Sequence, residues 1–186
     1  AVFPNNWISF HSYNKAILYP MFAPNRRFER ESKILDKLSV SGIEIEIIND
    51  YSLYENENRF LEGTGSIVLD RKSKKAYCSL SSHESKPIYH TNVMMSICNN
   101  FTIICLDSIR DKNERNNIIE NLNNSGLEII DISINQMTSF LGNCIQLINS
   151  DQSPKLIMSS RAFNSITKSQ IKRIESHTEI IHSDIK

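Results

Sequence analysis

The chain has 186 residues, enough for one good-sized hydrophobic core or two small ones. Its 21 Lys and Arg balance 21 Asp and Glu, so net charge gives no reason to expect nucleic acid or an anionic membrane as a partner. No apolar run approaches the ~18–20 residues that span a bilayer, and the opening residues AVFPNNW do not resemble a signal peptide. We expect no membrane span, and the missing initiator Met leads us to expect further residues upstream.

A strand-rich pattern recurs four times along the chain. Each copy begins with a small or polar turn that enters a strand-like run; we call these turns anchors, and they are PNNWISF, LEGTGSIVL, YHTNVMMSI and FLGNCIQLI. A second strand-like run follows each anchor: KAILYPM, KAYCSLS, FTIICLDSI and KLIMSSRA. Three of the four copies then continue into a helical pattern.

The first expected helix covers residues 25–38, with Phe28, Leu35 and Leu38 on one face and Gly42 as the stop signal. A short alternating strand, IEIEIIND, comes next. The same order of helix and strand recurs twice further along the chain.

The second expected helix covers residues 110–126, where Ser108 and Asp111 predict a capping box and Gly126 predicts the end. The third covers residues 161–177. The strands that follow are LEIIDIS and TEIIHSDI. The apolar stripes of these two helices are Ile118, Ile119 and Leu122 in the second, and Phe163, Ile166 and Ile174 in the third.

The repeated unit is therefore strand, strand, helix, strand, which predicts an α/β propeller in which the anchors converge on one central site. We expect a single domain over residues 1–186 that is incomplete at both ends. Only residues 83–86 separate YCSLSS from PIYHTNV, too few for a helix and a returning strand. Either this unit has lost its outer half, or roughly 25–40 residues are absent near residues 82–88; we favour the absence because the pieces on both sides are otherwise well formed.

The four cysteines form no CxxC pair, and each lies in an apolar, strand-like run: Cys78, Cys98, Cys105 and Cys144. Cysteines of this kind are typical of buried free thiols in a reducing compartment. We therefore expect a cytoplasmic protein with buried, unpaired thiols.

Polar residues occupy equivalent places in successive anchors, namely Asn5, Asn6, Glu62, His90, Asn92 and Asn143. A carboxylate can take a bidentate hydrogen bond from a planar guanidinium, and a histidine can transfer protons at neutral pH. Each residue also has a structural interpretation: a lone strand histidine is more often part of a core than catalytic, and Glu62 could simply be the cap of its turn. A metal site built from His11, His83 and His90 is disfavoured because no pair has ligand spacing.

Five motifs in order, AVFPNNWISFH, YPMFAPNRRFER, RFLEGTGSIVLDR, IYHTNVMM and FLGNCIQL, resemble the arginine deiminase-related amidinotransferase family. Within it, the chain most resembles the bacterial citrulline-utilisation hydrolase type. The resemblance implies the pentein fold, a five-bladed α/β propeller of ββαβ units. It also implies attack by a cysteine on the guanidinium or amidino carbon of an arginine-like substrate, without a metal or organic cofactor.

The resemblance assigns roles to individual residues. His90 corresponds to the catalytic histidine, and Glu62 to the catalytic carboxylate that binds the guanidinium. Phe3 and Asn6 fall in the family pattern Phe-x-x-Asp, and Asn92 falls two residues after the histidine, where arginine deiminases have a second aspartate. These three are substrate-binding candidates.

Arg26 corresponds to the arginine that binds the substrate's carboxylate, with Arg27 as the next choice and a solvated helical turn as the structural alternative for the pair. Both family aspartates are asparagine here, which weakens the charge attraction for a guanidinium. None of the four cysteines has the Gly-rich setting of the family nucleophile, so we expect it beyond Lys186. An amidinotransferase, a non-catalytic guanidino-binding protein and a homo-oligomer all stay open.

Overall fold

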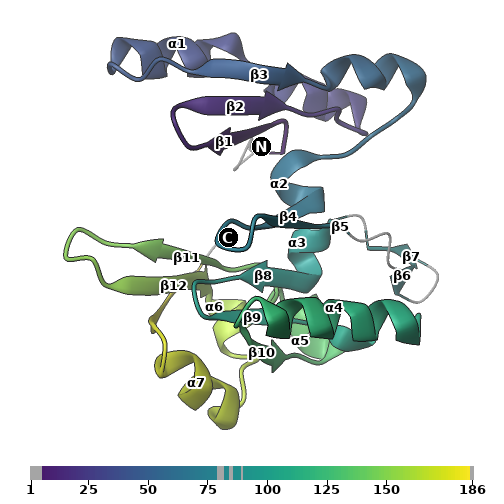
Figure 1. Cartoon of the computed structure of the whole chain (residues 1–186), viewed down its shortest axis with the longest axis vertical. Helices are drawn as coiled ribbons and strands as arrows, with labels where there is room; N and C mark the ends of the chain where they lie inside the picture. Colours follow the sequence, from purple (N-terminus) through teal and green to yellow (C-terminus); the bar gives the residue numbers. More distant parts are fainter. Residues whose placement is uncertain (1–5, 79–81, 84–85, 89, 185–186) are drawn as a thin grey trace. The chain divides into compact units, whose positions relative to one another are not determined.

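The computed structural model describes residues 6–78, 82–83, 86–88 and 90–184. The chain forms two compact units, Ala1–Ile67 and Val68–Lys186, which we call unit 1 and unit 2. Figure 1 shows the elements of both. None of the described helices is long and apolar enough to cross a membrane.

Unit 1 contains one complete copy of the predicted repeat. Its elements are β1 (Ile8–His11), β2 (Lys15–Leu18), η1 (Pro24–Glu29), α1 (Ser32–Val40), β3 (Glu46–Asp50), η2 (Ser52–Glu57) and α2 (Gly63–Ser66). β1 pairs antiparallel with β2, and β2 pairs parallel with β3. The buried core is Trp7, Ile8, Ala16 and Met21, and Ile34 and Leu35 of α1 pack against it.

Unit 2 begins with β4 (Ile67–Asp70) and β5 (Lys75–Cys78), then β6 (Ser82–His83) and β7 (Lys86–Pro87). The next repeat consists of α3 (Thr91–Met94), β8 (Met95–Ile97), β9 (Phe101–Ile104), η3 (Leu106–Ser108), α4 (Lys112–Asn124) and β10 (Glu128–Asp131). The last consists of α5 (Ile134–Thr138), β11 (Ile145–Ile148), β12 (Pro154–Ser159), α6 (Ser160–Phe163), α7 (Lys168–Glu175) and β13 (Glu179–Ser183).

Three sheets share one topology, with orders β1-β2-β3, β8-β9-β10 and β11-β12-β13. In each, the first two strands are antiparallel and the last two are parallel. This confirms the predicted strand, strand, helix, strand unit. The helix supplies the crossover that a parallel pair of strands requires.

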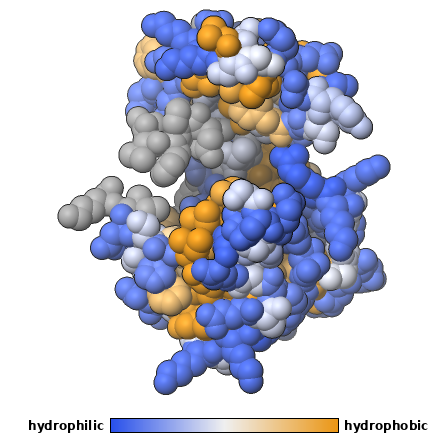
Figure 2. All heavy atoms as spheres, turned by 90° about the vertical axis from the view of Figure 1, so that its left-hand side faces the viewer, coloured by the Kyte–Doolittle hydropathy of each residue, from blue (hydrophilic) through white to orange (hydrophobic). Residues whose placement is uncertain are grey.

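One continuous core holds unit 2 together, from Val68 of β4 to Ile174 of α7. The expected stripes contribute to it, because Leu122 and Ile174 are buried and Ile118, Phe163 and Ile166 pack against the core. Apolar side chains also reach the surface, as Figure 2 shows for one face of the molecule. The exposed ones in unit 2 include Ile145, Leu147 and Ile148 on β11.

The three expected helices are present, but each is shorter or broken. Residues 25–38 form η1 and then α1, because Glu31 between them has an extended backbone. As a result Phe28, which we expected on the apolar face, is 82% exposed. Residues 161–177 form α6 and α7, because Thr167 and Gln170 make a capping box that starts a new helix.

The predicted capping box of Ser108 and Asp111 is wrong. Asp111 is itself the N-cap of α4 and accepts the Glu114 N–H at 2.8 Å. The Ser108 hydroxyl instead donates to the Cys105 carbonyl at 2.6 Å, since Ser108 belongs to η3 and the chain is extended at Ile109. The two glycine stop signals are confirmed, with φ of +80° at Gly42 and +72° at Gly126.

Candidate functional site

The second anchor places Glu62 at the start of α2. This helix is the four-residue stretch Gly-Thr-Gly-Ser, and Glu62 is its N-cap residue. A Cβ at Gly63 would lie 2.5 Å from the Tyr19 ring and 3.1 Å from the Asn6 carbonyl oxygen, so the turn can pack here only because residue 63 is glycine. The Glu62 side chain is buried, with 1% exposed.

The Glu62 carboxylate receives several hydrogen-bond donors within unit 1. Asn6 Nδ2 donates to Oε2 at 3.0 Å, and Arg26 Nη1 donates to the same oxygen at 3.1 Å. The Phe22 N–H donates to Oε1 at 3.2 Å, and Thr64 Oγ1 donates to Asn6 Oδ1 at 3.4 Å. A carboxylate at this depth needs such partners because burial of an uncompensated charge is costly. The structure therefore brings three predicted site residues together: Asn6, Arg26 and Glu62.

The two candidate arginines of η1 point to different partners. Arg26 pairs with Glu62 and also with Glu29, whereas Arg27 Nε donates to the Met21 carbonyl at 3.0 Å and lies 3.4 Å from Glu55. Arg30 pairs with the same Glu55. The two arginines do lie in a helical turn, as the structural alternative has it, but their side chains are half-buried and ion-paired. Of the two, Arg26 is the one that bonds to Glu62.

Unit 2 holds the other two candidates, His90 and Asn92. His90 is the half-buried N-cap residue of α3, whose first residue, Thr91, is buried. Asn92 is the second residue of α3, and the Asn143 side chain donates from Nδ2 to its carbonyl at 3.0 Å. The third and fourth anchors are therefore bonded to one another.

His90 and Glu62 occupy equivalent backbone positions, as the repeat predicts. Each is an extended residue before a four-residue helix that leads directly into a strand. In both helices the N–H of the residue after the helix bonds to the carbonyl of its first residue. The backbone therefore presents an imidazole in one repeat where it presents a carboxylate in the other.

Phe3 and Asn5 lie outside the described residues, so their assignments stay predictions.

Sequence reasoning missed one residue of the site, Glu29, whose carboxylate accepts two hydrogen bonds from Arg26. The signal was present in the stretch APNRRFER, where an arginine and a glutamate stand three residues apart. Among the residues that the structure describes, no three His, Cys, Asp or Glu side chains gather as metal ligands would.

The cysteines are free, and Cys98 and Cys105 are buried. Burial raises the pKa of each of these thiols, and it raises the pKa of Cys144 to about 11. The expectation of burial is wrong for Cys78, which is exposed at the end of β5; its pKa is nevertheless also raised by partial desolvation. None of the four environments favours the thiolate that a nucleophilic cysteine needs.

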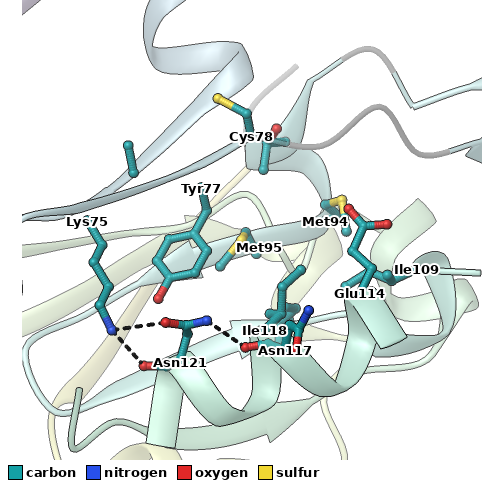
Figure 3. A pocket seen from close by; sticks show the side chains of 13 residues that line it. Lys75, Tyr77, Cys78, Met94, Met95, Ile109, Glu114, Asn117, Ile118 and Asn121 are labelled. Atoms are coloured by element: carbon teal, nitrogen blue, oxygen red, sulfur yellow. Dashed lines mark hydrogen bonds between the residues drawn. The ribbon is translucent and has the colours of Figure 1, made fainter. Parts of the chain in front are cut away.

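A pocket of about 430 Å³ lies in unit 2 (Figure 3). Its lining includes Thr91, which stands between His90 and Asn92 in the sequence. Four consecutive β5 residues line it, and since side chains alternate along a strand, it must lie against the strand's edge. The opposite wall is α4, where Lys75 Nζ donates to the Asn121 carbonyl at 3.2 Å. Among the described residues the sheet here has only β4 and β5, so a third strand is not seen beside β5.

Comparison with known proteins identifies the family of the chain. The family model for eukaryotic N,N dimethylarginine dimethylhydrolase matches residues 1–85 and 81–186. The chain belongs to this dimethylarginine dimethylhydrolase family. The two matches meet near residues 82–88, where we expect residues to be absent; that absence stays a prediction. No curated protein sequence matches the chain.

Two solved structures from cyanobacteria have a similar fold. One is apo ArgZ, an arginine dihydrolase of the ornithine–ammonia cycle, with 12% identity and a TM-score of 0.69 over 98% of this chain. The other is the ArgZ N-terminal domain (C264S) bound to substrate, with 13% identity and a TM-score of 0.66 over 98% of this chain. The chain spans 30% of the full ArgZ chain and 68% of that domain. The predicted α/β fold of the pentein type is confirmed.

Proposed function

We propose that the full-length protein is a cysteine-dependent hydrolase of the guanidino or ureido group of an arginine-related compound. The observation that carries the proposal is the Glu62 carboxylate, which is buried and already accepts a hydrogen bond from a guanidinium, that of Arg26. Membership of the dimethylarginine dimethylhydrolase family supports the same reaction type. The finer resemblance to citrulline-utilisation hydrolases is part of the proposal.

In the proposed reaction, a cysteine thiolate from beyond Lys186 forms a bond to the central carbon of the substrate's guanidino group. The C–N bond to the leaving amine then breaks as His90 supplies a proton, which leaves a thiouronium-like adduct. His90 next takes a proton from water, the hydroxide adds to the same carbon, and the thiolate departs. The products are an amine and a ureido compound, with no change of oxidation state.

The remaining residues bind the substrate in this proposal. Glu62 accepts N–H groups of the reacting guanidinium, Asn6 and Asn92 contribute amide groups, and Phe3 is a further substrate-binding candidate. Arg26 is the candidate for the substrate's carboxylate. Because two family aspartates are asparagines here, the substrate can be less basic than free arginine, which is why ureido compounds stay within the proposal.

The proposal is tested with full-length protein and a panel of arginine, N-methylated arginines, agmatine and citrulline, assayed for release of ammonia, amine or urea. Turnover of at least one compound, lost in His90→Ala, is the expected result. An amidinotransferase would instead need an amine acceptor for product formation. A non-catalytic member of the family would bind a compound of the panel and release nothing.

A further inference from the structure

Glu29 holds the Arg26 guanidinium along one edge. Arg26 Nε donates to Glu29 Oε1 at 3.1 Å, and Nη2 donates to Oε2 at 3.2 Å. The two residues stand three apart in η1, and a 3-10 helix places residues at this spacing on the same side. The Glu29 side chain is 12% exposed, so this two-bond fork between the guanidinium and the carboxylate is largely sheltered from solvent.

The two-bond fork fixes the plane of the guanidinium, because rotation about the last bonds of the arginine would break both hydrogen bonds. In this orientation Nη1 meets Glu62 Oε2 at 3.1 Å. Arg26 is therefore a bridge between two carboxylates. Taken over these three side chains alone, Glu29 offsets the positive charge of Arg26, and the cluster that includes Glu62 carries one net negative charge.

We propose that Glu29 is a positioning and specificity-determining residue, which holds Arg26 on Glu62 and offsets the positive charge of Arg26, so that the cluster of three side chains keeps one net negative charge. This charge replaces part of the attraction that Asn6 lacks, and it favours a cationic guanidino compound over its neutral ureido counterpart. The inference rests on the proposed function, since it concerns what Glu62 binds. It adds a residue that acts through Arg26 without touching the substrate.

The test compares the binding of arginine and citrulline to the full-length protein by calorimetry. The two compounds share their carboxylate, so the ratio of their dissociation constants reports only on the guanidino or ureido end. Glu29→Gln removes one negative charge and is expected to weaken arginine binding about tenfold relative to citrulline. Glu29→Asp keeps the charge and should leave the ratio close to wild type.

The double variant Arg26→Met with Glu29→Gln makes the test specific. It again leaves one net negative charge among the three side chains, and it should restore the wild-type ratio. Glu55→Gln is the matched control: it makes the same charge change in the neighbouring cluster, where Glu55 pairs with Arg27 and Arg30. An equal loss for both ligands, an equal effect of Glu55→Gln, or no recovery in the double variant would overturn the proposal.

If the proposed function itself is wrong, the binding experiment gives a different result from the results that overturn the role of Glu29. If the wild-type protein binds neither arginine nor citrulline, the assignment of Glu62 to these compounds is wrong. The hold of Glu29 on Arg26 is then read from the Arg26 Nε–H resonance in 1H–15N NMR spectra. Its loss in Glu29→Gln and retention in Glu55→Gln would support the positioning role, and an unchanged resonance in Glu29→Gln would contradict it.

Discussion

The anchors that carry Glu62 and His90 share one backbone course but differ in their surroundings. Both residues precede a four-residue helix that enters a strand. Glu62 is buried and bonded to Asn6, Arg26 and the Phe22 N–H, whereas His90 is half-buried. A fixed carboxylate suits binding of a cation, and a more accessible imidazole suits proton transfer. The repeat thus supplies one backbone scaffold, and in the proposed function the residue at its N-cap position gives each copy its role.

The strongest test of this division of roles is His90→Ala. Removal of a general acid and base should lower kcat by about a thousandfold, within the range that such catalysis contributes. The melting temperature should stay near wild type, because the side chain is not part of the buried core. The measurement is steady-state turnover by the full-length protein, and activity near wild type would remove His90 from the mechanism.

Glu62→Gln should have the next largest effect, mainly on substrate binding. A neutral amide loses the charge-assisted hydrogen bonds, and we expect kcat/KM to fall about a hundredfold. In contrast to His90→Ala, this variant should also lower the melting temperature, since Arg26 loses a buried partner. If KM and the melting temperature were both unchanged, Glu62 would have a different role.

Two glycines within the anchors, Gly63 and Gly142, should differ in how well they tolerate substitution by alanine. A Cβ at Gly142 would lie 2.4 Å from the Val93 carbonyl oxygen, which is backbone of α3, whereas the worst contact at Gly63 is with the Tyr19 side chain. We expect Gly142→Ala to destabilise unit 2 by about 3 kcal/mol and Gly63→Ala to destabilise unit 1 by about 2 kcal/mol. Urea unfolding curves measure both, and a harmless Gly142→Ala would show that α3 can shift.

Asn143→Ala should have the smallest effect. Its side chain is exposed and bonds to the Asn92 carbonyl, so its loss should cost about 0.5–1 kcal/mol of unfolding free energy. Urea unfolding again provides the measurement, and KM should not change if the bond only holds α3 in place. A large rise in KM would instead indicate that Asn143 contacts the substrate.

The repeat could be predicted from the sequence because apolar periodicity and glycine stop signals are local features. The break between η1 and α1 could not, since neither a glycine nor a proline marks the extended residue Glu31. The contact of Arg26 with Glu62, which lies 36 residues away, could not be predicted either. The same distant contact separates Arg26 from Arg27, which the local sequence cannot distinguish. The exposure of Cys78 was missed because an apolar strand pattern does not reveal whether a further strand covers its edge.

The central claim is that Glu62 and His90 serve one reaction on a guanidino or ureido compound. Its most direct test is the amount of ureido product, amine, ammonia or urea that full-length protein releases from the substrate panel, compared with Glu62→Gln and His90→Ala. We expect turnover of at least one compound by the wild-type protein, with kcat nearly abolished in His90→Ala and kcat/KM reduced in Glu62→Gln. Wild-type kcat/KM in both variants, or no turnover of any compound by the wild-type protein, would contradict the account.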